Sequence, residues 1–171
     1  MTTTAGLDLS LTGTGVAITV DGQRSIARIS TPPTADLSGT HKRLLKIVDA
    51  VEHLVPRGSL VCIEGPSMAS KFGHPHDRSG LWWLVADMLY RNSCRIVAVP
   101  PTTRAKYATG KGNAGKDAVF AAVIRKHPDL PINSNDVADA VILDDIANRL
   151  NGTPLDSPPE THLKAMEGIA P

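Results

Sequence analysis

The 171-residue sequence has only two cysteines, no long hydrophobic run and almost no net charge. Cys62 and Cys94 lack the spacing of a metal site and are too few for a disulfide framework, so we expect reduced thiols in a cytoplasm. The longest apolar run, residues 81–86, is far too short to cross a bilayer. Residues 1–4 lack the basic-then-apolar pattern of a signal peptide. We therefore expect a cytoplasmic protein with no membrane partner.

Length and composition indicate one globular domain. Hydrophobic residues make up 42% and charged residues 20% of the chain, which is ordinary for such a protein. A chain of 171 residues can form one substantial core and is rather short for two. We predict a domain over residues 1–150 and a mobile tail over 151–171, where prolines stand at 154, 158, 159 and 171.

Charge is distributed unevenly along the chain although the net charge is +1. Residues 91–126 carry eight Lys or Arg and one acid, whereas residues 127–171 carry two Lys or Arg and eight acids. In a nearly neutral protein, this pattern is typical of a polyanion-binding surface beside a cation site. Solvated helix faces of opposite sign explain the same pattern equally well.

Strand and helix patterns alternate along the sequence. Apolar runs and period-two alternation predict strands at residues 4–10, 16–20, 24–30, 59–63 and 96–99. Helical spacing predicts helices at about 38–55, 81–89, 118–127 and 136–150, with a loop at 73–76. Three hairpin-linked strands followed by strand–helix alternation predict an α/β fold. Its mixed five-stranded sheet is antiparallel at first and parallel afterwards, with helices on both faces.

Four carboxylates occupy positions that suggest a shared site. Asp8 falls inside the first predicted strand, where an unpaired charge is costly. Glu64 ends a buried strand, and ligands of open α/β sheets bind at such ends. Asp136 and Asp139 lie three residues apart on a predicted helix and so project from one face. We expect Asp144, on the same helix, to be exposed, as well as Asp145.

Two of the four acids also have a simple structural explanation. Asp136 suits the positive end of a helix dipole, with Ser134 or Asn135 as the cap. Glu64 is explained equally well as a solvated strand end. Taken together, however, four carboxylates balance two divalent cations, and such pairs occur in phosphodiester-cleaving sites. Oxygen ligands favour Mg²⁺ or Mn²⁺ over zinc.

Several motifs together resemble the RuvC Holliday junction resolvases, and most closely the phage-encoded RuvC-like proteins. The resemblance covers residues 5 to about 150. It is carried by Gly6-Leu7-Asp8, Thr12-Gly13-Thr14-Gly15-Val16, Val61-Cys62-Ile63-Glu64, residues 101–116 and Asp136-Val137-Ala138-Asp139-Ala140. The order and spacing of these motifs are more specific than any one of them alone.

The resemblance implies a fold, an activity and a set of site residues. It implies an RNase H-like fold, a homodimer, branched DNA as substrate and two Mg²⁺ ions, for which Mn²⁺ substitutes. The catalytic and metal-binding acids fall on Asp8, Glu64, Asp136 and Asp139, and cleavage leaves 5′ phosphates. Lys116 matches a family lysine near the scissile phosphate, although a solvated first-turn lysine is an alternative explanation. Expected DNA contacts are Lys71, Arg78, Arg104, Lys106, Lys111 and Lys116.

The sequence also departs from the family pattern. Asp8-Leu9-Ser10 replaces the usual Asp-Pro-Gly turn, a second family lysine aligns with Ala105, and no aromatic wedge follows Glu64 before Phe72. Flaps and forks therefore join four-way junctions as candidate substrates. Two alternative functions stay open, a ribonuclease acting on RNA–DNA hybrids and a non-catalytic junction-binding protein.

Two nucleotide-binding alternatives fit the sequence less well. Residues 110–117 nearly match a P-loop, but Asp117 stands where a hydroxyl residue is required. An actin-like ATPase needs two domains of this kind, for which the chain is too short. The motif His74-Pro75-His76 has no nearby partner ligands and is better explained as part of a polar loop than as a metal site.

Overall fold

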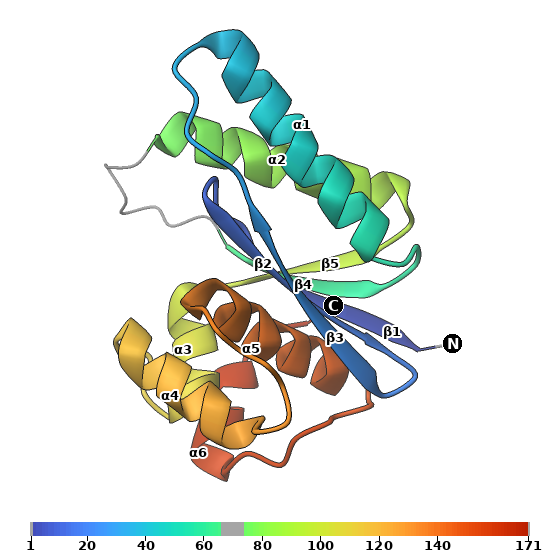
Figure 1. The fold of residues 1–171 in the computed structure, drawn as a ribbon. Coiled ribbons are helices and arrows are strands. Elements are labelled where there is room, and N and C mark those ends of the chain that lie inside the picture. The colour runs from blue at the N-terminus through green and yellow to red at the C-terminus, as the bar shows by residue number, and fades with distance from the viewer. Residues whose placement is uncertain (1, 66–73, 171) are drawn as a thin grey trace.

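A five-stranded sheet runs between two layers of helices in the computed structural model, which describes residues 2–65 and 74–170 (Figure 1). The strand order is β3-β2-β1-β4-β5. Strands β1, β2 and β3 pair antiparallel, whereas β1, β4 and β5 pair parallel. The strands are β1 Thr3–Asp8, β2 Gly13–Val20, β3 Gln23–Ser30, β4 Leu60–Glu64 and β5 Arg95–Val99. This arrangement confirms the predicted mixed α/β sheet.

Helices cover both faces of the sheet, as predicted. One face carries α1 (Leu37–Leu54) and α2 (Pro75–Arg91), and the other carries α3 (Pro101–Thr109), α4 (Lys116–Lys126) and α5 (Asn135–Leu150) (Figure 1). A separate cluster of buried apolar residues lies on each side. No helix within residues 2–65 and 74–170 is long and apolar enough to span a membrane.

Two helical segments differ from the sequence prediction. Helix α2 begins at Pro75, so part of the predicted loop at 73–76 is helical; a proline suits the first helical position because it lacks a donor there. Helix α3 was not predicted at all. Its residues show little helical periodicity, yet Ala105, Tyr107 and Ala108 are buried because α3 packs against α4 and α5.

Three glycines allow helix α5 to lie directly on strands β1 and β2. A Cβ atom on Gly6 would stand 2.1 Å from the carbonyl oxygen of Ala140, and one on Gly15 would stand 1.9 Å from that of Asp136. At Gly13 a Cβ would reach 2.5 Å from the carboxylate of Asp136. The glycine-rich motif therefore sets the distance at which the start of α5 meets the sheet.

The variant Gly15→Ala is expected to be destabilised by about 3 kcal/mol, at the upper end of overpacking effects, because the added methyl group meets backbone that cannot rotate away. Denaturant unfolding measures this change. Gly115→Ala is the matched control, since a Cβ there meets nothing within 4 Å and the φ of −70° suits alanine. Equal stability of the two variants would contradict the close packing.

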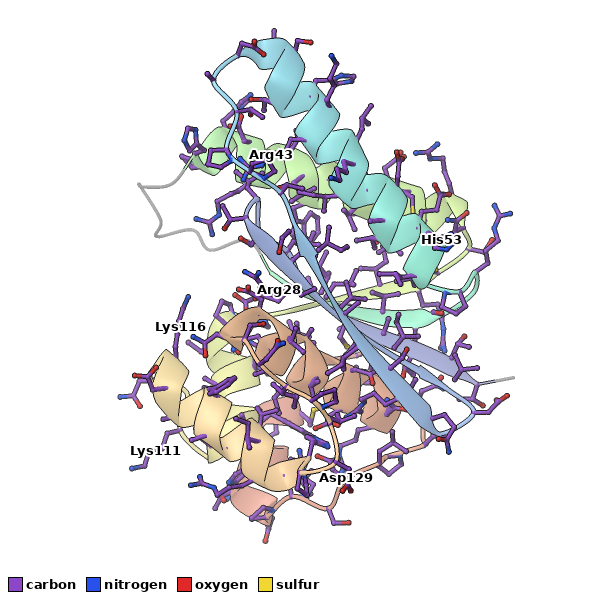
Figure 2. The ribbon with its side chains drawn as sticks, viewed as in Figure 1. Arg28, Arg43, His53, Lys111, Lys116 and Asp129 are labelled. Atoms are coloured by element: carbon purple, nitrogen blue, oxygen red, sulfur yellow. The ribbon has the colours of Figure 1, made fainter. Side chains whose placement is uncertain are left out.

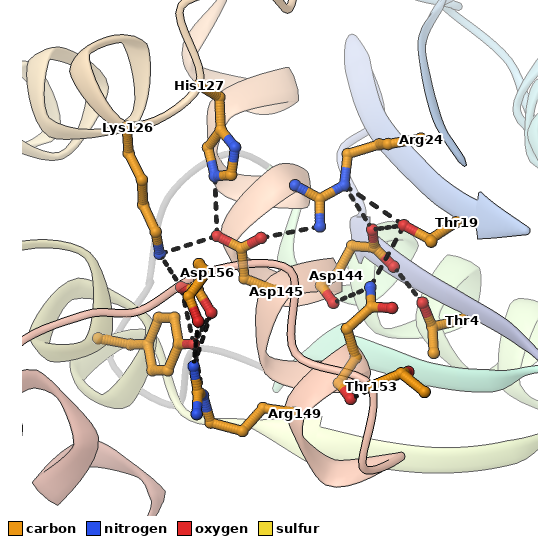
Figure 3. A network of polar contacts seen from close by, with 12 residues as sticks. Thr4, Thr19, Arg24, Lys126, His127, Asp144, Asp145, Arg149, Thr153 and Asp156 are labelled. Atoms are coloured by element: carbon orange, nitrogen blue, oxygen red, sulfur yellow. Dashed lines mark hydrogen bonds and ion pairs between the residues drawn. The ribbon is translucent and has the colours of Figure 1, made fainter. Parts of the chain in front are cut away.

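Asp144 and Asp145 are fully buried, so our prediction that they are exposed is wrong. Arg24 on β3 bridges them, with Nε 2.7 Å from Asp144 Oδ2 and Nη2 2.8 Å from Asp145 Oδ1 (Figure 3). Thr4 and Thr19 also donate to Asp144, at 2.7 and 2.6 Å. The middle of α5 is therefore tied to the sheet by charge as well as by apolar packing.

Asp145 gives the network a dependence on pH. Burial alone would raise its pKa, but the hydrogen bond with His127 and the charges of Arg24 and Lys126 outweigh burial and hold the pKa below its ordinary value. The unfolded carboxyl titrates near pH ~3.9. The stability that this group contributes is therefore complete above about pH 4 and lost as the pH falls.

We accordingly expect the free energy of unfolding of the wild type to fall more steeply between about pH 5 and pH 3 than that of Asp145→Asn, because the amide cannot take up a proton. Urea titrations at several pH values provide the measurement. Parallel pH profiles for the two proteins would show that Asp145 does not carry this dependence.

The chain beyond Leu150, expected from the sequence to be a mobile tail, returns to α3. It contains helix α6 (Glu160–Leu163) and the 3₁₀ turn η1 (Lys164–Met166), and Ala165 is buried. Asp156 accepts hydrogen bonds from Tyr107 on α3 and Arg149 on α5, at 2.9 and 2.8 Å (Figure 3). This segment therefore packs against the helix that carries Arg104.

Candidate active site

Two of the predicted acids lie at the ends of adjacent parallel strands. Asp8 is the last residue of β1, not a mid-strand residue as the sequence suggested, and Glu64 is the last residue of β4. The register pairs Leu7 with Ile63, so Asp8 and Glu64, the next residue on each strand, lie at the same sheet edge. Side chains at the carboxyl ends of neighbouring parallel strands open on a common ligand position.

The other two acids come from the first turns of α5. Ser134 is the N-cap and its hydroxyl accepts from the backbone N–H of Val137 at 3.3 Å, which fixes where the helix begins. Asp136 lies in the first turn, and Asp139, one turn further, is only 7% exposed. All four acids line one cavity of about 470 Å³, so the structure brings these predicted site residues together.

Two arginines hold three of the four carboxylates. Arg104 on α3 donates through Nε to Glu64 Oε2 and through Nη1 to Asp139 Oδ1. Arg28 on β3 donates through Nε to Asp136 Oδ2 at 2.8 Å. By contrast, no described residue forms a hydrogen bond or an ion pair with the carboxylate of Asp8, although the charge of Arg104 acts on it. Within the described residues, one acid of the cavity is therefore left without a directly bonded cation.

Burial and like charge together disfavour ionisation in this cavity. Burial raises the pKa of Asp8 well above its ordinary value, and the charges of Glu64 and Asp139 raise it further. Burial also raises the pKa of Asp139 to about 6, although the charges of Arg104 and Lys116 oppose the shift. A cluster of this kind binds cations because a cation relieves the repulsion between its carboxylates.

The carboxylate oxygens of the cavity are of the kind that bind divalent metal ions, but these side chains are not arranged around a common metal position. Four carboxylates line the cavity, and carboxylate oxygens are the ligands that Mg²⁺ and Mn²⁺ prefer. Yet, among the described residues, no group of three or more His, Cys, Asp or Glu is placed so that it could hold a metal ion. The physical reason is that Arg104 and Arg28 occupy the positions facing Glu64, Asp139 and Asp136.

The predicted DNA-binding residues divide into three groups. Lys116, the first residue of α4, is exposed at the rim of the cavity, and Arg78 on α2 also lines it. Lys106 and Lys111 do not line the cavity; Lys106 donates to the backbone oxygen of Lys164 at 3.4 Å. Arg104 lies inside the cavity on two carboxylates. Lys71 lies outside the described residues.

Three residues that line the cavity or pair with its acids were not found by sequence reasoning. Arg28 pairs with an acid 108 positions away. Arg43 on α1 donates to the backbone oxygen of Leu11 at 2.6 Å and to the hydroxyl of Thr31 at 2.9 Å. His74, the residue before α2, also lines the cavity. In Figure 2 Arg28 and Lys116 lie on the side of the molecule where α5 begins, with Arg43 on the α1 layer above them. No motif marks these residues, because their roles depend on which elements meet.

The fold is similar to two solved structures of RuvC from Thermus thermophilus. One is 17% identical, with a TM-score of 0.69, and the match covers 88% of this chain and 97% of that chain. The second is RuvC in complex with a Holliday junction substrate; it is 18% identical with a TM-score of 0.65, and covers 90% and 98% of the two chains. No protein-family model and no curated protein sequence matches the chain. The protein therefore has a RuvC-like, RNase H-like fold.

Proposed function

We propose that the protein is a metal-dependent endonuclease of the phage-encoded RuvC type, which cleaves branched DNA and leaves 5′ phosphates. The observation that carries the proposal is the cavity in which Asp8, Glu64, Asp136 and Asp139 converge at the sheet edge. Its place on a fold similar to that of a protein solved with a Holliday junction substrate supports DNA as the ligand.

The four acids are the residues that would hold two Mg²⁺ or Mn²⁺ ions. Bound there, such ions supply an activated water and stabilise the leaving oxygen of a phosphodiester. Lys116 stands at the cavity rim, and its charge lowers the pKa of Asp139, which indicates that its ammonium group acts on the same space. A cation at this position offsets the charge that develops on a phosphate in the transition state.

The approach of DNA is favoured by the basic residues around this cavity. Arg43 and Arg78 lie on the α1/α2 side of the opening, and Lys116 lies on the α4 side. Cations on both sides of an acidic cavity attract the phosphate backbone while the acids retain metal ions. This contribution to binding weakens steeply as the salt concentration rises.

The test is cleavage of end-labelled substrates with and without Mg²⁺. Four-way junctions, flaps, forks, linear duplexes and RNA–DNA hybrids are incubated at equal concentration, and the products are sized and their 5′ ends analysed. Mg²⁺-dependent cleavage of branched DNA supports the proposal. Cleavage of the hybrid alone would assign a ribonuclease instead, and binding of junctions without any cleavage would assign a non-catalytic junction-binding protein.

We also propose a homodimer that associates through α2. Trp83 is 67% exposed and Tyr90 is 62% exposed, and their spacing of seven positions, about two helical turns, places both on one side of the helix. Large exposed aromatic side chains are enriched at protein interfaces and often dominate their binding energy.

The variant Trp83→Ala is expected to weaken the dimer by roughly 30-fold or more, the effect of losing an interface residue worth about 2 kcal/mol. Sedimentation at several protein concentrations gives the dissociation constant. Ile124→Ala, a change at an exposed apolar residue of α4 in the opposite layer, is the control and is expected to leave association unchanged. Unaltered association of the Trp83 variant would exclude this face of α2.

A further inference from the structure

The guanidinium of Arg104 lies across two carboxylates of the proposed metal site. Its Nε donates to Glu64 and its Nη1 donates to Asp139. Arg104 is 9% exposed and Asp139 is 7% exposed, so this ion pair is largely withdrawn from water. A buried charge stays in place only while another charge compensates it, so Arg104 can leave these acids only if a second cation replaces it.

The backbone of Arg104 is fixed although its side chain is long. Helix α3 starts directly after β5, whose last residue Val99 is paired with Glu64 in the sheet. Its neighbours Ala105 and Tyr107 are buried in the core. Movement of the guanidinium away from the acids therefore requires only rotation of its own side-chain bonds, with no change in α3.

The direct ion pairs of the four acids leave the charge of one divalent cation unmatched. Arg104 and Arg28 pair with three of the four carboxylates and neutralise two charges, so the remainder equals the charge of a single Mg²⁺ or Mn²⁺. Among the described residues, Asp8 is the acid with no direct ion pair, which places this demand for a cation beside β1. Other cations also line the cavity, and Lys116 acts on Asp139 through its charge. Release of Arg104 frees two carboxylates and one further charge for a second cation.

We propose that Arg104 is an internal counter-cation that occupies part of the metal site and exchanges with the second divalent ion. The inference rests on the proposed function, because it takes the four acids to be metal ligands. With Arg104 in place, the protein holds its acids together without metal and takes up one ion. When Arg104 withdraws from Glu64 and Asp139, both carboxylates become free to bind the second ion.

Counting Mn²⁺ ions on the DNA-free protein tests this role independently of cleavage. Titration calorimetry is expected to give two unequal affinities for the wild type. In Arg104→Gln the second affinity is expected to rise at least about tenfold, because a competitor that occupies the site nine-tenths of the time or more has been removed. Arg104→Lys keeps a cation but cannot bridge both acids, and we expect it to fall between the two.

Arg91→Gln is the control, since Arg91 does not line the cavity and pairs with Asp87 at the surface. We expect its second Mn²⁺ affinity to equal that of the wild type. Melting curves provide a second readout, because Arg104→Gln without metal leaves Glu64 and Asp139 unpaired. The melting temperature of this variant is expected to lie below that of the wild type and to rise more when Mn²⁺ is added.

Three outcomes would overturn the inference: a second affinity weakened by Arg104→Gln, two equal affinities in the wild type, or an equal rise of the second affinity in the Arg91 variant. Absence of Mn²⁺ binding in all folded variants would overturn both the inference and the proposed function. If Mn²⁺ binds as expected but no DNA substrate is cut, the proposed nuclease fails and the role of Arg104 stands.

Discussion

Asp8→Asn is expected to reduce cleavage of branched DNA at least about 10³-fold while junction binding is retained. Asp8 is the acid of the cavity that no described residue pairs with directly, so its carboxylate oxygens are available to a metal ion. An amide of the same shape removes that charge, and a metal ion stabilises a phosphodiester transition state by several kcal/mol, equivalent to a loss of this size. Single-turnover cleavage at saturating enzyme, together with gel-shift binding, separates the chemical step from binding.

The same substitution is expected to stabilise the metal-free protein. Burial and the neighbouring charges of Glu64 and Asp139 make an ionised Asp8 unfavourable, so a neutral amide relieves repulsion within the fold. The melting temperature without metal should therefore rise, and the gain on adding Mg²⁺ should shrink. This pairing of lost activity with gained stability distinguishes a site residue from one needed for folding.

Asp87→Asn is the matched control for this change. Asp87 is an exposed aspartate on α2 whose ion pair with Arg91 lies at the surface, with side chains 63% and 72% exposed. We expect the control to cleave and to melt as the wild type does. If Asp8→Asn cuts junctions at the rate of this control, Asp8 has no part in the reaction and the proposed site is wrong.

Arg24→Met is expected to destabilise the fold by about 3–5 kcal/mol, the cost of removing one partner from a buried ion pair. The side chain of Arg24 is 6% exposed, and it is the residue that joins Asp144 and Asp145. Without it, two buried carboxylates lose their shared guanidinium. Methionine keeps much of the apolar part of the arginine side chain, so the loss of stability measures mainly the effect of the removed charge. Equilibrium unfolding in urea measures the difference.

Arg91→Met provides the comparison for Arg24→Met. It also removes an arginine from an aspartate, but at an exposed pair, where such interactions contribute roughly 0–1 kcal/mol. A similar loss of stability in both variants would mean that the Asp144/Asp145 network is no stronger than a surface ion pair. A large loss in Arg24→Met alone supports the network as a link between α5 and the sheet.

Most of the regular structure could be predicted because its causes are local. Alternation and helical spacing placed all five strands and helices α1, α4 and α5 close to their observed bounds, since each pattern reflects one buried face. The same spacing located α2 but missed its first turns, which begin at Pro75. Helix α3 was not predicted because its buried residues do not follow helical spacing. The exposed positions predicted for Asp144 and Asp145 were wrong because their partner Arg24 lies 120 residues away.

The sequence by itself determined the order of the strands and helices apart from α3. It also named the four acids that line one cavity, because Asp8 is a costly charge within a strand pattern, Glu64 ends another, and Asp136 and Asp139 share a helix face. Only the tertiary structure decided which cations meet those acids. Arg28 and Arg104 reach Asp136 and Asp139 across 108 and 35 residues. Such pairs follow from which elements pack together, and no local pattern in the chain encodes that contact.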